Sequence, residues 1–150
     1  MTNSTQTNEA GWKTAAIIVA RLIYAAVFIM ACSFKFMDIK DTADAIAGAG
    51  FPLPVLLAWL AACFELALIL GFLTGAFFTE TALLAAAYVL FLAVSFHGPA
   101  HWGTSQAEFG FFVDHFTFIA GLLFAAAHGP GRFAVKLGWI GRKHSSLSLA

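Results

Sequence analysis

The side chains best placed to do chemistry are charged residues inside apolar stretches. Glu65 interrupts the run WLAACFELALILGFL, residues 59–73, and Arg21 lies in the apolar run at 15–34. A charge in hydrocarbon is costly, so it needs a partner, a proton or a water-filled cavity. The sequence therefore predicts that Arg21 and Glu65 form a buried charge pair between two helices. Such a pair would either fix the helix register or form the polar floor of a ligand cavity or proton relay.

A second group of polar side chains is expected where the spans end on the other side of the membrane. Lys35 closes the first apolar run, and Asp114 lies about a turn and a half into the last one, so we expect a Lys35–Asp114 ion pair. The candidate ligand-binding residues at this mouth are Lys35, His97, His101, Asp114 and His115. They predict a head-group site for a quinone or a similar apolar ligand, with Lys35 and His115 donating to a carbonyl oxygen and Asp114 holding them.

Two plainer interpretations of the histidines stay open. They can serve as hydrogen-bonding groups at the membrane interface, or they can bind a metal, because imidazole and carboxylate suit several divalent ions. Gly98 and Pro99 break the helix that would present His97 and His101 together. We therefore expect no metal site.

The first apolar run also carries a stripe of chemically useful residues. Arg21, Tyr24, Phe28, Cys32 and Lys35 recur at helical spacing and so share one face. Core packing accounts for the three middle residues, but a lipid-facing stripe would expel the two cations.

Other reactive side chains have simple structural explanations. Cys32 and Cys63 stand alone in separate apolar stretches, so their spacing indicates neither a redox motif nor a zinc site. Glu80 and Glu108 fall near expected helix starts, where the backbone dipole favours an acid.

The composition decides the class of protein. Of 150 residues, 61% are hydrophobic and the mean hydropathy is +0.85, which indicates an integral membrane protein. Only 11% are charged and the formal net charge is zero, so no nucleic-acid partner is expected.

Four stretches are long and apolar enough to cross a bilayer, which takes about 20 residues. They lie near 15–36, 52–73, 76–96 and 109–127. Residues 39–47 show helical spacing and predict a short interfacial helix between the first two spans. The expected fold is an all-α, four-helix transmembrane bundle at 15–132, with a polar N-terminal tail at 1–14 and a cytoplasmic C-terminal tail at 133–150.

The basic residues predict the orientation. Lys13, Arg132, Lys136, Arg142 and Lys143 would lie on one side of the membrane, and Lys35 and Lys40 on the other. Because Lys and Arg favour the cytoplasmic side, both termini are expected in the cytoplasm.

The order of several short motifs resembles the DoxX family of small bacterial membrane proteins. They are Arg21 and Lys35 in one span, GFPLP before a span with Glu65 in ELALILGFLTG, HGP near residue 98, and HGPGR from His128. The resemblance covers about 17–139 and implies four transmembrane helices in the bacterial inner membrane. It also implies that Arg21, Lys35 and Glu65 are typical intramembrane charges and that Gly129, Pro130, Gly131 and Arg132 form a C-terminal turn. The family often has a Ser and an Asp after that turn, where this chain reads FAVK.

The resemblance also guides the functional expectation, because the family takes its name from a subunit of a thiosulfate:quinone oxidoreductase. We expect a redox-linked membrane subunit, associated with a quinone or a thiol-handling enzyme. The alternative is a non-catalytic membrane anchor or assembly partner of a complex, and a proton-coupled carrier using Glu65 is a third interpretation. No flavin, haem or iron–sulfur ligand set is evident in the sequence, so a quinone is the one cofactor considered. The expected partners are the lipid bilayer and a redox protein, with self-association into a homo-oligomer left open.

Overall fold

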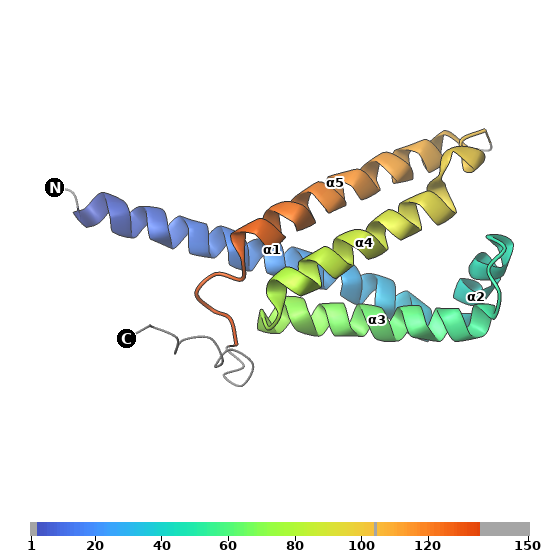
Figure 1. The fold of residues 1–150 in the computed structure, drawn as a ribbon, viewed down its shortest axis with the longest axis horizontal. Coiled ribbons are helices and arrows are strands. Elements are labelled where there is room, and N and C mark those ends of the chain that lie inside the picture. The colour runs from blue at the N-terminus through green and yellow to red at the C-terminus, as the bar shows by residue number, and fades with distance from the viewer. Residues whose placement is uncertain (1–2, 104, 136–150) are drawn as a thin grey trace, which may run out of the picture.

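The computed structural model describes residues 3–103 and 105–135, with side chains from residue 11 onward. Every regular element in this part of the chain is a helix (Figure 1). The elements are α1 (Asn3–Met37), α2 (Ile39–Gly48), α3 (Pro54–Thr74), α4 (Phe78–His97), the 3-10 helix η1 (Pro99–His101) and α5 (Gln106–His128). The predicted N-terminal tail is helical from Asn3 onward. The C-terminal tail beyond residue 135, with Lys136, Arg142 and Lys143, lies outside the described residues.

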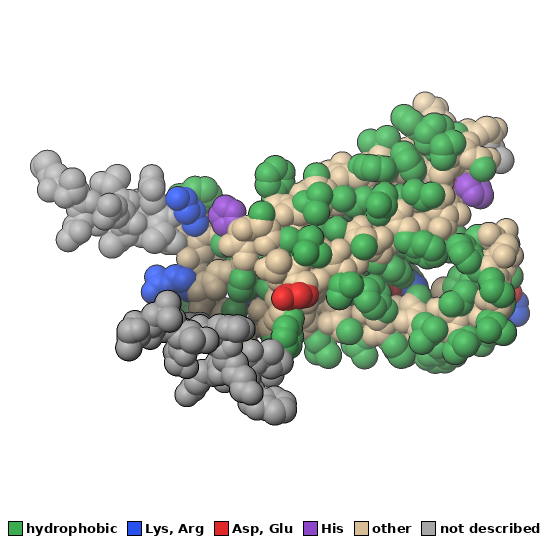
Figure 2. Space-filling model, in the orientation of Figure 1, with side chains coloured by type: hydrophobic (Ala, Val, Ile, Leu, Met, Phe, Trp, Pro, Cys, Tyr) green, Lys and Arg blue, Asp and Glu red, His purple; other side chains and the backbone are tan. Residues whose placement is uncertain are grey.

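Four of these helices are long and apolar enough to cross a membrane. They are Gly11–Met37 within α1, Pro54–Thr74, Phe78–His101 and Gln106–His128. Large apolar side chains cover the outside of the bundle (Figure 2), including Leu22, Leu70 and Phe124. Apolar side chains on the outside suit a hydrocarbon solvent. The protein is an integral, multi-pass membrane protein, and the predicted all-α fold is confirmed.

The four spans form two antiparallel pairs. Helix α1 packs along α3, and α4 packs along α5. A short turn at Gly75, with φ of 69°, joins α3 to α4, but these two helices move apart from that turn onward (Figure 1). The start of α1 and the segment after α5 lie at the same end of the bundle, which we call the terminal end. The opposite end carries α2 and η1, and we call it the α2 end.

Near the terminal end the two pairs are held together by an aromatic core. Phe72 of α3 is fully buried; it stacks on Tyr24 and Phe28 of α1, and its ring meets Phe78 of α4 edge to face. Such ring pairs add about 0.5–1.5 kcal/mol beyond the burial of their area. This core closes the terminal end of the bundle.

Glycines allow two close approaches between helices. A Cβ on Gly71 of α3 would lie 2.7 Å from Cγ2 of Thr81 on α4 and still closer to its Oγ1. A Cβ on Gly121 of α5 would meet the hydroxyl of Tyr24. Small residues of this kind let helix backbones approach in a membrane.

The expected short helix between the first two spans is α2. Its N-cap is Asp38, whose side chain accepts a hydrogen bond from the Asp41 backbone N–H. Ala43 and Ile46 are buried and pack with Ala58 of α3. Helix α2 is therefore held against the start of α3, at the open side of the bundle.

We predict that Gly71→Ala destabilises the fold by about 1–3 kcal/mol, because the added methyl group overpacks the contact with Thr81. Thermal unfolding in detergent measures the effect. Gly110→Ala is the matched control, since a Cβ there meets nothing within 4 Å. Adding Thr81→Ala to Gly71→Ala should restore most of the loss. Equal stability of Gly71→Ala and Gly110→Ala would contradict the close approach.

Candidate functional site

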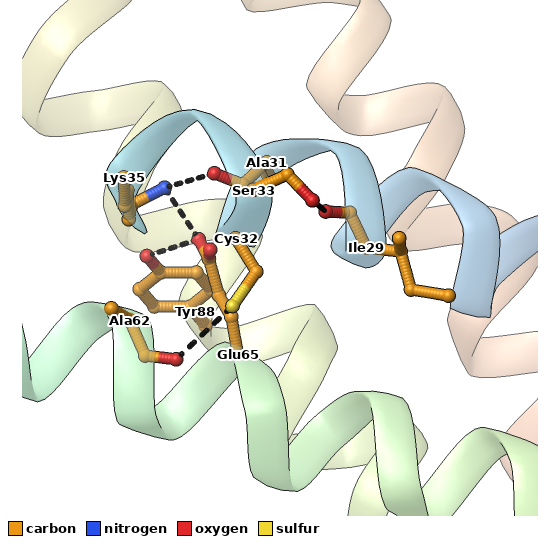
Figure 3. Close-up of polar contacts among 8 residues, drawn as sticks. All are labelled: Ile29, Ala31, Cys32, Ser33, Lys35, Ala62, Glu65 and Tyr88. Atoms are coloured by element: carbon orange, nitrogen blue, oxygen red, sulfur yellow. Dashed lines mark hydrogen bonds and ion pairs between the residues drawn. The ribbon is translucent and has the colours of Figure 1, made fainter. Parts of the chain in front are cut away.

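Glu65 lies at the centre of a polar cluster drawn from three helices (Figure 3). Its side chain is 1% exposed, and its Oε1 accepts hydrogen bonds from Nζ of Lys35 at 2.9 Å and from the hydroxyl of Tyr88 at 2.8 Å. Lys35 comes from α1, Glu65 from α3 and Tyr88 from α4. The cluster therefore links the α1–α3 pair to the α4–α5 pair. It neutralises a carboxylate that would be very unfavourable alone in hydrocarbon.

The second carboxylate oxygen of Glu65 has different surroundings from the first. Oε2 is buried and has no hydrogen-bond partner among the described residues. Most buried polar atoms are paired, so an unpaired carboxylate oxygen points to a functional role or to bound solvent.

The predicted pair between Arg21 and Glu65 is wrong. Arg21 is buried, as expected, but its guanidinium donates to backbone carbonyls and to no carboxylate of the described residues. Nε donates to Phe72 O and Nη2 to Leu73 O, at the end of α3. Nη1 donates to Pro130 O and Phe133 O, in the segment after α5. These oxygens carry the negative end of the backbone dipole, which a cation stabilises.

The helix register explains the error. The contacts of Arg21 with Phe72 and of Cys32 Sγ with Ala62 O place α1 and α3 side by side. Glu65 comes seven residues before Phe72, so it lies about 10 Å closer to the start of α3 than the level of Arg21. Depths counted from the edges of two apolar runs could not resolve this offset.

The predicted pair between Lys35 and Asp114 is also wrong, because Lys35 pairs with Glu65. The side chain of Lys35 folds back along its own helix, and Nζ comes within 3.5 Å of Ala31 O. Side chains on a helix lean toward its N-terminus, so a long lysine can reach a partner one turn back. Asp114 is an exposed residue of α5.

A cavity of about 1210 Å³ opens between the two helix pairs at the α2 end. Figure 2 shows an opening in this region, between the α2 side and the α4–α5 side. The wall is mostly apolar and aromatic, with Phe34, Phe64, Phe91 and Phe96 among its side chains. Its polar lining consists of Lys35, Asp38, Asp41, Thr42, Cys63, Tyr88, His97 and His115. The donors that hold Glu65 thus also face the cavity.

Three of the five predicted mouth residues line this cavity: Lys35, His97 and His115. His101 belongs to η1, and neither His101 nor Asp114 is among the described residues that line the wall. The rings of His97 and His115 lie 5.1 Å apart, centroid to centroid, although they come from α4 and α5. No group of three or more potential metal ligands occurs within 3–103 and 105–135.

Outside the spans, the charges of α2 pair on the surface. Lys40 donates to Asp44 one turn away, and this hydrogen bond raises the pKa of Lys40. Both side chains are largely exposed, so the pair has little effect on stability.

A comparison with known protein families matches residues 16–98 to DoxX. The matched region spans α1 to α4 and includes Arg21, Lys35, Glu65 and Tyr88. The chain belongs to the DoxX family. Comparisons with curated proteins and with solved structures found no match.

Two residues of this DoxX-family site were missed from the sequence. Tyr88 is the one tyrosine of α4, and a polar tip in an apolar helix could have indicated a buried hydrogen bond. Glu108 was explained by its position at a helix start, yet its Oε2 lies 2.7 Å from Nδ1 of His97. No spacing rule links these two, because a loop and η1 separate them.

We predict that Glu65→Leu destabilises the protein by at most about 3–5 kcal/mol, because it leaves the partly buried Lys35 ammonium without its partner. Combining Lys35→Met, Glu65→Leu and Tyr88→Phe should recover most of this loss, since all three polar groups then disappear together. Arg21→Met with Glu65→Leu is the matched control and should show additive losses. Unfolding in detergent by circular dichroism measures these three variants and Arg21→Met alone. Recovery in the Arg21 pair instead would contradict the assignment of partners.

Proposed function

We propose that this DoxX-family protein is a redox-linked membrane subunit whose cavity binds an apolar ligand with a quinone-type head group. One observation carries the proposal: the Lys35 ammonium and the Tyr88 hydroxyl are anchored on a buried carboxylate and also line an aromatic cavity. Pockets that combine apolar walls with a few convergent polar groups are typical ligand sites.

The Lys35 ammonium suits a carbonyl oxygen, because the Tyr88 hydroxyl already donates its proton to Glu65. The ammonium of Lys35 has three N–H groups, so a carbonyl oxygen of the ligand can accept a further charge-assisted hydrogen bond from it. Glu65 holds this ammonium in place, which is the role that the sequence had suggested for Asp114. Because the anchor is built before the ligand arrives, less conformational entropy is lost on binding.

The walls suit the remainder of such a ligand. A volume of about 1210 Å³ exceeds the roughly 300–1000 Å³ of ordinary small-molecule pockets, so a ring and part of an apolar tail fit. Phe64 and Phe91 line the same wall and offer aromatic surfaces for the ring. Electron transfer to or from a bound quinone needs a second redox group, which we place on a partner protein.

A non-catalytic anchor is the second candidate, and Arg21 favours it. Its guanidinium binds carbonyls at the end of α3 and in the segment after α5, and Val135 N–H donates to Thr74 O beside them. This network fastens the C-terminal segment to the bundle, as a docking platform for a partner would require. The ligand experiment below separates the two candidates.

We further propose that the protein lies in the bacterial inner membrane with both termini in the cytoplasm. The described ends, with Lys13 and Arg132, fall at the same end of the bundle (Figure 1). At the α2 end Lys35 is neutralised by Glu65 inside the protein, which leaves Lys40 beside Asp38, Asp41 and Asp44. The excess of positive charge at the terminal end supports a cytoplasmic placement.

We predict that detergent-purified protein binds decylubiquinone in a calorimetric titration. Lys35→Met should weaken binding by roughly 10- to 100-fold, as expected for the loss of a charge-assisted hydrogen bond of about 1.5–3 kcal/mol. Tyr88→Phe should weaken it less, because the Tyr88 hydroxyl proton is donated to Glu65. Lys40→Met is the control, because Lys40 pairs with Asp44 on the surface. Absence of binding to the wild-type protein would exclude the quinone function and leave the anchor.

The orientation predicts which loops a membrane-impermeant maleimide reaches in cells with a permeabilised outer membrane. In a background with Cys32→Ala and Cys63→Ala, Gly103→Cys should be labelled directly and Gly11→Cys only after lysis. Both positions suit a new side chain, since a Cβ there meets nothing within 4 Å. The reverse labelling pattern would place the termini outside.

A further inference from the structure

His97 and Glu108 form a hydrogen-bonded dyad at the edge of the cavity. His97 ends α4 and Glu108 lies in the first turn of α5, and their Nδ1 and Oε2 atoms are 2.7 Å apart. An ionised carboxylate can only accept a hydrogen bond, so Nδ1 of His97 carries the proton. In the neutral ring Nε2 is then left as an acceptor. His97 lines the cavity, and Glu108 contacts the ring through its other nitrogen.

His115 is fixed in the same tautomer by a different partner. Its Nδ1 lies 2.6 Å from Phe111 O, and a carbonyl oxygen only accepts. Nε2 of the neutral His115 ring is therefore also an acceptor. The two rings lie 5.1 Å apart and both line the cavity.

The surroundings hold this arrangement in place. The indole N–H of Trp102 donates to His97 O at 2.9 Å, and the Trp102 ring meets Phe109 and Phe112 of α5 edge to face. Ser105 caps α5 by accepting from Ala107 N–H, which fixes the turn that carries Glu108. These contacts hold Glu108 beside Nδ1 of His97, which fixes the tautomer of the ring.

We propose that the His97–Glu108 dyad, with His115, accepts the hydroxyl proton of a reduced, hydroquinone-type ligand. The inference rests on the proposed function, which supplies the ligand class. In this step the ligand O–H bond breaks and an N–H bond forms at Nε2 of His97; the electron pair stays on the oxygen, and nothing is oxidised. The resulting imidazolium lies between the phenolate and the carboxylate of Glu108. Glu108 is a positioning residue, because it acts through the ring.

The donors and acceptors of the cavity therefore recognise different forms of the same ligand. Lys35 donates and suits a quinone carbonyl, whereas His97 and His115 accept and suit a hydroquinone hydroxyl. A ligand that covers an acceptor without donating to it binds more weakly, which makes the discrimination measurable. The dyad therefore predicts that the hydroquinone form binds more tightly than a form whose oxygens carry no proton.

The test compares three probes by anaerobic calorimetry: decylubiquinone, decylubiquinol and the dimethyl ether of decylubiquinol, which cannot donate. Wild-type protein should bind the quinol roughly 10-fold more tightly than its ether. Glu108→Gln and His97→Phe should remove most of this preference and weaken quinol binding more than quinone binding. Glu80→Gln is the control, since Glu80 occupies the same place in α4 as Glu108 does in α5, at its first turn.

The outcomes separate the two proposals. Equal affinity of the wild-type protein for quinol and ether would overturn the dyad, and so would an equal loss of quinone and quinol binding in Glu108→Gln. Failure of every probe to bind would instead overturn the proposed function. His97→Phe keeps an aromatic ring beside Phe111. If Glu108→Gln folds poorly, His97→Phe therefore still provides the test.

Discussion

The need to neutralise Glu65 inside the bundle organises the middle of this protein. One carboxylate oxygen receives an ammonium from α1 and a phenol from α4, so a single buried charge joins both helix pairs. In a membrane the hydrophobic effect does not favour one helix contact over another, and polar contacts help to decide which faces meet. The low dielectric strengthens each of these hydrogen bonds and also makes their loss costly. The cluster therefore specifies how the α1–α3 and α4–α5 pairs meet.

The two ends of the bundle differ because their polar groups have different hydrogen-bond partners. At the terminal end Arg21 donates to backbone carbonyls and Phe72 fills the centre, so the helices close on one another. Toward the α2 end the two helix pairs separate, and the side chains between them line a cavity. Arg21 contacts backbone carbonyls at the closed end, whereas Lys35 contacts Glu65 and also lines the cavity. The same residue type, a cation in an apolar helix, thus has two roles in one chain.

The sequence predicted the spans and the shared face of α1, because hydrophobic length and helical spacing are local properties. Arg21, Phe28 and Cys32 are indeed buried on that face. The partners of the charges were not predicted, since apolar runs define helix ends only to within a few residues and a turn of offset exchanges one partner for another. Glu108 was missed for a related reason: its contact with His97 depends on the path of the loop around η1, which hydropathy does not describe.

Helix α4 contributes to both proposed recognition sites, and this places them in order along the cavity. Tyr88 and His97 are nine residues apart, which is about 13 Å along a helix. A single quinone ring is too small to be held tightly at both points at once. In the proposed scheme the oxidised ring lies at the Lys35 ammonium, next to Glu65 and Tyr88, and the reduced ring at the outer acceptors, next to Glu108. A change in redox state would then move the preferred position of the head group toward the mouth, where a partner protein has access to it.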